Sequence, residues 1–455
     1  YIKIIIKLKI IMQVTHYCNS FNSFKAGNST LVCDPWVGEA AQTAWVSFPI
    51  HENGGKFLNN LRPDFIYISH LHCDHLDPKT LLGLKNKNIK IIIKKFKIPI
   101  LKKQIQQLGF NNICEYEPWK KYRLNKDISF AIIPQMSSNN SGLPEQINYD
   151  LDTSIVLQSN KTKEVFYNGV DNPLTDKNYI TVKKFIEKKF NKNIAIAVVQ
   201  DGAAGEYPQC FLNINRKNAK KKVILDTLKS VKKKIEILKP EKYISTSPSA
   251  IIAGKFSKLN ILAAKPTFND VKNYLETSYC DIINISGGGT ATKSKGKWKI
   301  KKMPNLPDEK KIIKKYLNKK YFYENDFKSI KNKNLDNLFL KACENYKEKV
   351  KRYPIKTSWV AEFHIYKNLL LNKSKKINKK SSKFIKKYSL DYNKSKSKKN
   401  FTKLICHLDE KLFYGLLTKK YTNWNQPTVG TLVLYERKPN KFDPNLLFSL
   451  NFLQT

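Results

Sequence analysis

The chain has 455 residues, of which 41% are hydrophobic and 12% aromatic, enough to bury the cores of two or three domains and to exclude global disorder. No run approaches the roughly 18–20 apolar residues of a membrane-spanning helix, so we expect a soluble protein without a membrane span. The net charge of +46 comes from 83 basic and 37 acidic residues, but only five of the basic residues are arginine. Proteins that read phosphates and bases favour arginine, so the lysine excess predicts a solvated surface and argues against nucleic acid as a partner.

The first residues and the cysteines indicate whether the protein carries a signal peptide and in which compartment it lies. Residues 1–11 are broken by lysines and precede no small-residue cleavage site, so we expect an extension ahead of a start at Met12 rather than a signal peptide. The eight cysteines are scattered singly and form no Cys-x-x-Cys pair. This pattern favours a reducing, cytoplasmic location over secretion.

From Met12 to about residue 285, short β-rich runs come first and helices enter later. The runs that predict strands are MQVTHYCNS, STLVCDPW, DFIYISH, IKIIIK, ISFAIIPQ, TSIVLQS, EVFYNGV, IAIAVV and KYISTS. Helices are predicted at 180–190 and at 216–238, where apolar residues recur every three or four positions and lysines occupy the other faces. This order predicts an α/β fold in which two sheets are covered by helices, an αββα sandwich.

The remaining chain divides by composition. We expect a first domain over 12–290, a lysine-rich helical extension over 291–371 and a low-complexity loop or linker over 372–400. Residues 401–455 regain hydrophobic character and are expected to form a C-terminal subdomain that packs on the first domain.

One short stretch, FIYISHLHCDHLDP at 65–78, concentrates three of the seven histidines within six positions. His70 and His72 alternate at the end of an apolar strand, so both imidazoles face the same side and can share a cation. Asp74 and His75 follow in a turn, close enough to hold a second ion or a water. Imidazole together with carboxylate suits zinc, iron or manganese rather than magnesium or calcium.

The His-x-His-x-Asp-His motif, with Asp-Pro-Trp at 34–36 ahead of it, resembles the metallo-β-lactamase superfamily. Within that superfamily, the chain is similar to the metal-binding domain of the cytidine monophosphate N-acetylneuraminate (CMP-Neu5Ac) hydroxylases. DLDTSIVL, FYNGVDN, QDGAAGEYPQCF and the terminal RKPNKFDPNLLFSLNFLQT support this resemblance. It implies a metallo-β-lactamase-type sandwich for residues 12–290.

The resemblance also implies ligands. It places His70, His72 and Asp171 around one metal, and Asp74, His75 and Asp171 around a second. The third histidine of the family falls on Asn148, and its last histidine has no counterpart in YISTSPSA. Asn148 and Asp150, or Asp152, are therefore candidate replacement ligands. One or two zinc ions are the expected cofactor, with iron or manganese as alternatives.

Three functions remain open at this point. The first is a metal-dependent hydrolase in which Asp74 orients or deprotonates a metal-activated water, acting on a phosphate- or nucleotide-sugar-type substrate. The second is the oxygenase component for a CMP-linked, sialic-acid-like sugar. The chain contains no Cys-x-His and Cys-x-x-His pair for an iron–sulfur cluster, so this function requires a separate Rieske protein as partner. The third is a degenerate, non-catalytic binding protein, which the missing histidines support.

A second loop follows the predicted strand IAIAVV. Asp201 and Gly202 open the small-residue stretch QDGAAGEYP, at the strand end where open α/β sheets place ligand-binding loops. We therefore predict that Asp201 and Gly202 contact the substrate.

Overall fold

The structure is a computed structural model of the chain. It describes residues 12–136, 152–202, 205–246, 249–276, 279–327, 335–353, 355, 357–391, 402–421 and 424–455. The predicted extension at 1–11 and the candidate ligands Asn148 and Asp150 lie outside these residues.

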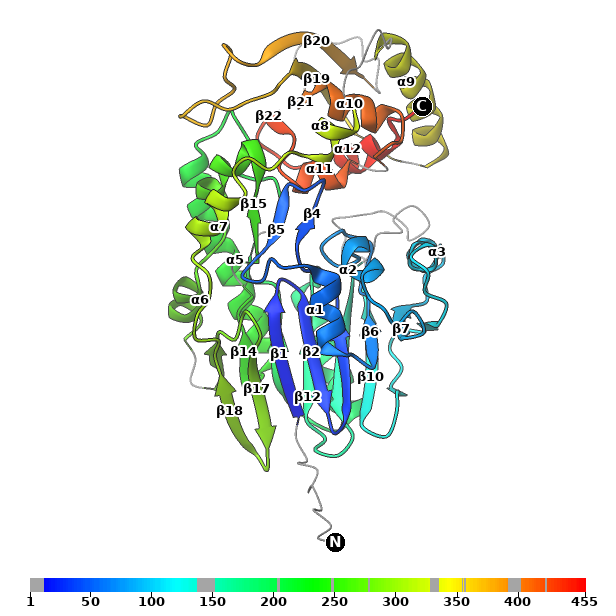
Figure 1. The fold of residues 1–455 in the computed structure, drawn as a ribbon, viewed down its shortest axis with the longest axis vertical. Coiled ribbons are helices and arrows are strands. Elements are labelled where there is room, and N and C mark those ends of the chain that lie inside the picture. The colour runs from blue at the N-terminus through cyan, green and yellow to red at the C-terminus, as the bar shows by residue number, and fades with distance from the viewer. Residues whose placement is uncertain are drawn as a thin grey trace.

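Two mixed sheets pack face to face in the lower part of Figure 1. The first contains, in spatial order, β18 (Lys297–Lys301), β17 (Gly289–Ser294), β1 (Met12–Cys18), β2 (Phe21–Ala26), β3 (Ser29–Cys33), β6 (Phe65–Tyr67), β7 (Lys90–Lys94) and β8 (Ile113–Tyr116). The second contains β16 (Asp281–Ile283), β14 (Lys242–Ile244), β13 (Ile194–Val198), β12 (Val165–Asn168), β11 (Thr153–Ser159), β10 (Ile128–Pro134) and β9 (Tyr122–Arg123). One cluster of buried side chains, including Phe24 and Phe166, joins the two inner faces.

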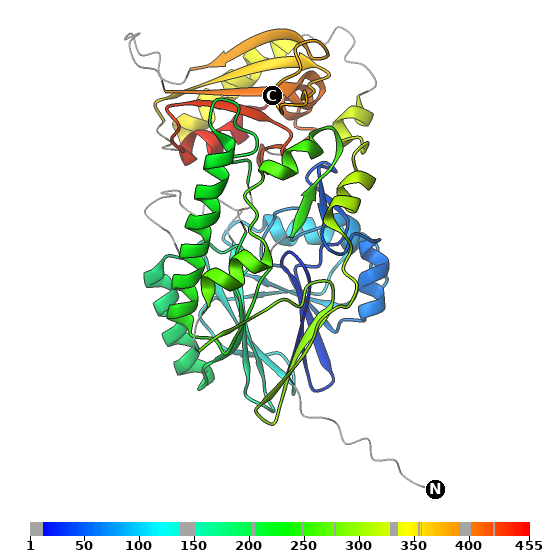
Figure 2. The same cartoon turned by 90° about the vertical axis from the view of Figure 1, so that its left-hand side faces the viewer.

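Helices cover both outer faces, as Figure 2 shows from the side. The first sheet packs against α1 (Gly54–Leu61), α2 (Pro78–Leu82) and α3 (Ile100–Gln107), and the second against α4 (Asp176–Phe190), α5 (Arg216–Leu238) and α6 (Phe268–Leu275). In α5 the buried residues are Leu228, Val231, Ile235 and Leu238, four of the five apolar positions that predicted the helix. The predicted αββα sandwich is confirmed.

The first sheet extends past the boundary expected at residue 290. β17 and β18 form a hairpin, and β17 pairs with β1, so residues 291–301 are strand rather than helix. Lys295 and Gly296, both with positive φ, make the two-residue turn between Ser294 and Lys297. Such a turn matches the twist of an antiparallel pair, and an X-Gly dipeptide between alternating residues is its sequence signal.

A smaller unit lies above the sandwich in Figure 1. Its sheet contains β20 (Lys383–Leu390), β19 (Trp359–Lys367), β21 (Thr402–Asp409) and β22 (Leu434–Lys438). The helices around it are α8 (Phe322–Asp326), α9 (Leu335–Arg352), α10 (Glu410–Leu417), α11 (Asn425–Val429), α12 (Pro444–Ser449) and the 3-10 helix η2 (Leu450–Phe452). β20 lies inside the range expected to be a loop or linker. It is a lysine-rich edge strand, and charged side chains are common on edges because they oppose pairing with other chains.

Short elements connect the two units. β4 (Glu39–Ala40), β5 (Trp45–Ser47) and β15 (Ala250–Ile252) form a three-stranded sheet, followed by the 3-10 helix η1 (Gly254–Leu262) and by α7 (Glu309–Lys315). The backbone of β22 also pairs with the first domain, since Leu212 N–H donates to the Tyr435 carbonyl at 2.7 Å and Tyr435 N–H to the Cys210 carbonyl at 2.9 Å. Among the described residues, every helix is too short or too polar to cross a bilayer.

Helices α1 and α2 cross at two glycines close to the histidine motif. A Cβ on Gly55 would lie 2.5 Å from the Gly83 Cα, closer than real side chains approach. We expect Gly55→Ala to lower the free energy of unfolding by about 1–3 kcal/mol, because the helices must move apart. Urea denaturation measures this, and Gly205→Ala is the control, since its Cβ would meet nothing within 4 Å. An equal loss in both variants would contradict the crossing contact as the cause.

Candidate metal centre

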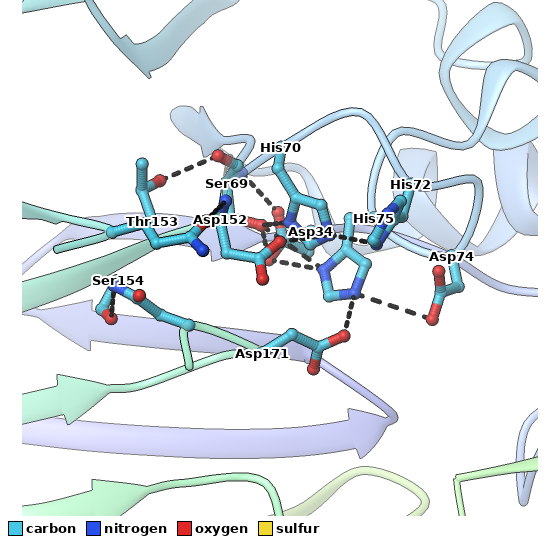
Figure 3. A network of polar contacts seen from close by, with 12 residues as sticks. Asp34, Ser69, His70, His72, Asp74, His75, Asp152, Thr153, Ser154 and Asp171 are labelled. Carbon is cyan, nitrogen blue, oxygen red and sulfur yellow. Dashed lines mark hydrogen bonds and ion pairs between the residues drawn. The ribbon is translucent and has the colours of Figure 1, made fainter. Parts of the chain in front are cut away.

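The histidine motif lies where β6 leaves the first sheet, and α2 begins directly after it. The Asp77 side chain caps α2 by accepting hydrogen bonds from the Lys79 and Thr80 amides, and Pro78 occupies its first turn. β6 therefore fixes where the motif begins and α2 where it ends, so the turn between them presents its side chains at one edge of the sandwich. Figure 3 shows these side chains converging.

His70 is the centre of the cluster. Its Nε2 lies 2.8 Å from His72 Nδ1 and 3.0 Å from the Asp152 Oδ1. Burial, together with the neighbouring His75 and His72, holds the pKa of His70 well below its usual value, so the imidazole is neutral. A neutral imidazole is the form that binds a metal.

His75 faces carboxylates on both sides. Its Nδ1 lies 3.1 Å from the Asp34 Oδ2, and its Nε2 lies 3.1 Å from the Asp171 Oδ2 and 3.6 Å from the Asp74 Oδ2. Burial opposes a charge on this ring, but Asp74 and Asp171 outweigh it and raise the pKa of His75 well above its usual value. Burial likewise disfavours charge on Asp171, and His75 outweighs it and lowers the pKa of that carboxyl.

Asp34, at the end of β3, sets the orientation of both rings. Its carboxylate is fully buried and accepts hydrogen bonds from the Ser69 amide and the Ser69 hydroxyl, both at 2.8 Å. Because the Ser69 hydroxyl donates to Asp34, its oxygen accepts from Nδ1 of His70 at 2.9 Å. Asp34 accepts directly from Nδ1 of His75. With both Nδ1 atoms protonated, Nε2 of each ring is the potential metal ligand, and at His75 a metal would replace the Nε2 proton that faces Asp171.

The second sheet supplies the facing carboxylates. Asp171 follows β12, and Asp152 directly precedes β11. β11 is tied to the motif, since the Thr153 hydroxyl donates to the Ser69 carbonyl at 2.8 Å. These contacts hold the two strand ends against the histidines, as Figure 3 shows.

In the part of the chain that the structure describes, two groups could hold an ion, and His70 belongs to both. They are His70, His72 and Asp152, and His70, His75 and Asp171, with ligand atoms within 4.8 Å of one another in each group. The resemblance placed Asp171 in both groups, with His70 and His72 in one and with Asp74 and His75 in the other. The geometry places Asp171 with His70 and His75, and Asp152 with His70 and His72. Three imidazoles and two carboxylates in this arrangement fit a zinc or iron ion better than magnesium.

Of the remaining predicted site residues, Asp74 and Gly202 line a cavity beside the histidines, whereas Asp201 is buried. Asp74 is held by Asn19, whose Nδ2 donates to its Oδ2 at 2.9 Å, and it lines the adjoining cavity. Gly202 lines the same cavity. The Asp201 carboxylate differs from the prediction: it is fully buried and accepts from the Thr246 amide at 3.2 Å and hydroxyl at 2.8 Å. Asp201 thus ties the end of β13 to the end of β14.

Asp34, Ser69 and Asn19 were not predicted as site residues. Asp34 was visible as the aspartate of Asp-Pro-Trp at a strand end, and Ser69 as the residue before His70. Asn19 carries no signal in the sequence, because its contact with Asp74 joins positions 55 residues apart.

Comparison with known proteins gives partial matches. No family model matches the chain. A Mycobacterium tuberculosis protein named as a Rieske 2Fe-2S iron–sulfur protein is 34% identical over 126 residues, 27% of this chain and 24% of that protein. The CMP-Neu5Ac hydroxylase of Asterias rubens is 34% identical over 128 residues, 27% of this chain and 19% of that protein. A solved Bacillus subtilis metallo-β-lactamase fold protein aligns with 63% of this chain at 10% identity and a TM-score of 0.38, covering all of its own chain.

The two sequence matches confirm the resemblance to CMP-Neu5Ac hydroxylase-like proteins over about a quarter of the chain. The chain spans less than a quarter of the length of these two sequence relatives. The activity, substrates and partners of the relatives therefore do not transfer directly.

Proposed function

We propose that the chain is a metal-dependent hydrolase acting on a phosphate- or nucleotide-sugar-type substrate. The observation that supports this most strongly is the pair of ligand groups sharing His70 beside a cavity that Asp74 and Asp171 line. A zinc ion held there would supply Lewis acidity and lower the pKa of water to about 7, so that a nucleophile forms at neutral pH.

The residues of the chain have distinct tasks in this proposal. Asp34 and Ser69 hold the rings of His70 and His75 so that both Nε2 atoms face the ligand site. Asp74, fixed by Asn19, accepts the proton from the attacking water at its carboxylate. His72, with Asp152 nearby, and Asp171 complete the ligand set.

The first test compares Asp171→Asn with the unchanged chain on a generic phosphodiester, bis(p-nitrophenyl) phosphate, after zinc loading. We expect zinc-dependent hydrolysis that EDTA abolishes, and a fall in kcat of about 10²-fold or more in the variant, because one carboxylate ligand is lost. Asp176→Asn, at a half-buried position at the start of α4 where the carboxylate pairs with Lys233, is the matched control and should retain activity. Zinc-loaded protein that hydrolyses no phosphate ester would contradict the proposal.

A second candidate is an oxygenase component that receives electrons from a separate Rieske protein. Each ligand group contains two histidines and one carboxylate, the set that holds non-haem iron in many oxygenases. The names of the sequence relatives, a Rieske iron–sulfur protein and a CMP-Neu5Ac hydroxylase, agree with this candidate. Metal analysis of the purified protein separates the two: redox-active iron would favour the oxygenase and zinc the hydrolase. A protein that binds no metal above background would leave only the non-catalytic alternative.

A further inference from the structure

A cavity that is partly open to solvent adjoins the candidate metal centre. Asp74 and Asp171 line it on the side of the metal centre. Its other walls come from distant parts of the chain, including Gln209 from the loop after β13, Lys265 after η1, and Thr431 after α11. The cavity therefore lies between the sandwich and the C-terminal unit, and both contribute to it.

Lys265 brings a cation into this cavity. Its Nζ donates to the Ala250 carbonyl, and within the described part of the chain no carboxylate lies at ion-pair distance from it. By contrast, Lys255 at the start of η1 pairs with Glu324 at 2.9 Å. An ammonium has three donors, so a single carbonyl leaves Lys265 with hydrogen-bonding capacity for a ligand. Burial lowers the pKa of Lys265 to about 8, as expected for an incompletely compensated charge.

Two neutral polar groups in the cavity are also unsatisfied. Among the described residues, the Gln209 Oε1 and the Thr431 Oγ1 are buried without a hydrogen-bond partner. Gln209 is 4% exposed and Thr431 is fully buried. Buried polar atoms normally find partners, because leaving one unpaired costs about 1–3 kcal/mol. A carbonyl oxygen that lacks a donor, together with a hydroxyl that meets only the weakly hydrogen-bonding Cys210 thiol, points to a ligand with hydroxyl or amine groups.

We propose that this cavity binds an anionic, hydroxyl-bearing substrate, with Lys265 holding its oxyanion and with Gln209 and Thr431 bonding its hydroxyls. For the hydrolysis of this substrate, the inference rests on the proposed function; the binding of the substrate does not depend on it. It makes the C-terminal unit part of the substrate site, because Thr431 belongs to that unit. The oxyanion is a phosphate or a carboxylate, which share the ability to accept from an ammonium.

Binding to the full chain, stripped of metal with EDTA and desalted, tests the anion site. Isothermal titration with inorganic phosphate and, separately, with acetate shows which oxyanion Lys265 prefers. We expect Lys265→Met to weaken binding of the preferred anion by about 10-fold or more and Lys265→Arg to restore most of it. Lys258→Met removes an exposed lysine of η1 and should change affinity less than about 2-fold, which controls for the general positive charge.

The hydroxyl contacts are tested by comparing glycerol 3-phosphate with inorganic phosphate. We expect the glycerol ester to bind about 3- to 10-fold more tightly to the unchanged chain. This advantage should disappear in Gln209→Met and in Thr431→Val, while both variants retain their affinity for inorganic phosphate.

A measurement on the unchanged chain applies even if Lys265→Met fails to fold. An amine-acetylating reagent at pH 8 should modify Lys265 more slowly when the anion is present, whereas Lys258 should react at the same rate. Equal anion affinity in Lys265→Met and the unchanged chain, or no protection of Lys265 by either anion, would overturn the proposal. These binding measurements are made without metal. A chain that binds the anion but does not hydrolyse an ester after zinc loading would therefore contradict the hydrolase function and not the anion site.

Discussion

His70→Ala is expected to remove both metal groups at once. His70 belongs to each of the two groups, so its loss leaves His72 with Asp152 and His75 with Asp171, each group one ligand short. We expect the metal content to fall from one or two ions per chain to background, and hydrolysis to fall by about 10²-fold or more. Atomic emission analysis of dialysed protein measures the metal, and hydrolysis is measured in parallel.

The control for this change is His51→Ala. His51 is only partly buried. Its Nδ1 lies 3.3 Å from the Pro49 carbonyl oxygen, and its ring meets the Tyr316 ring edge-on, with 6.2 Å between the centroids. This variant should keep the metal content of the unchanged chain, which excludes a general effect of losing a histidine. The proposed metal centre would be wrong if His70→Ala retained a full complement of metal.

Asp34→Asn is expected to weaken metal binding without removing any ligand. The Asp34 carboxylate accepts from the Ser69 amide, the Ser69 hydroxyl and the His75 ring. The asparagine amide has only one oxygen, which can still accept from the Ser69 backbone amide. Its NH₂ group then takes the place of the oxygen that accepts from His75 Nδ1. Because NH₂ is a donor, His75 must present an unprotonated Nδ1 to it. The single proton of the neutral ring is then held on Nε2 of His75, the nitrogen that faces Asp171 and would otherwise bind the metal. We expect metal affinity to fall by about 10- to 100-fold.

The same change should also lower stability. A buried carboxylate with three donors is replaced by a group that cannot satisfy all of them, so we expect the free energy of unfolding to fall by about 2 kcal/mol. The φ of +45° at Asp34 adds no further cost, because asparagine tolerates this region as well as aspartate does. Urea denaturation and competition with a zinc chelator measure the two effects.

Asp64→Asn is the matched control, since this exposed aspartate accepts one hydrogen bond from the Thr30 amide at 2.8 Å. An asparagine oxygen can still accept that bond, so stability should change by less than about 0.5 kcal/mol and metal affinity not at all. If Asp34→Asn bound metal as tightly as the unchanged chain, the role of Asp34 in orienting His75 would be excluded.

The sequence predicted the sandwich because its signals are local. The β-rich composition of MQVTHYC and the three- and four-residue spacing at 216–238 depend only on neighbouring residues, and both segments form the elements expected of them. The hairpin β17–β18 and the edge strand β20 were missed for a different reason. Lysines occupy the exposed positions of β18, and six of the eight residues of β20 are exposed, so neither segment has the apolar run of a buried strand. Edge strands are charged because of their place in the sheet rather than their own propensity.

The sequence by itself determined the histidine cluster, since four residues within six positions must lie close together wherever the strand ends. It also determined the αββα layering, through the order and periodicity of its elements. Only the tertiary structure decided which carboxylates face the histidines. Asp152 and Asp171 come from the second sheet, and the spacing from His70 to either residue gives no indication of which imidazole it meets. The packing of the two sheets decides that pairing, and the same packing brings Lys265 and Thr431 to the cavity beside it.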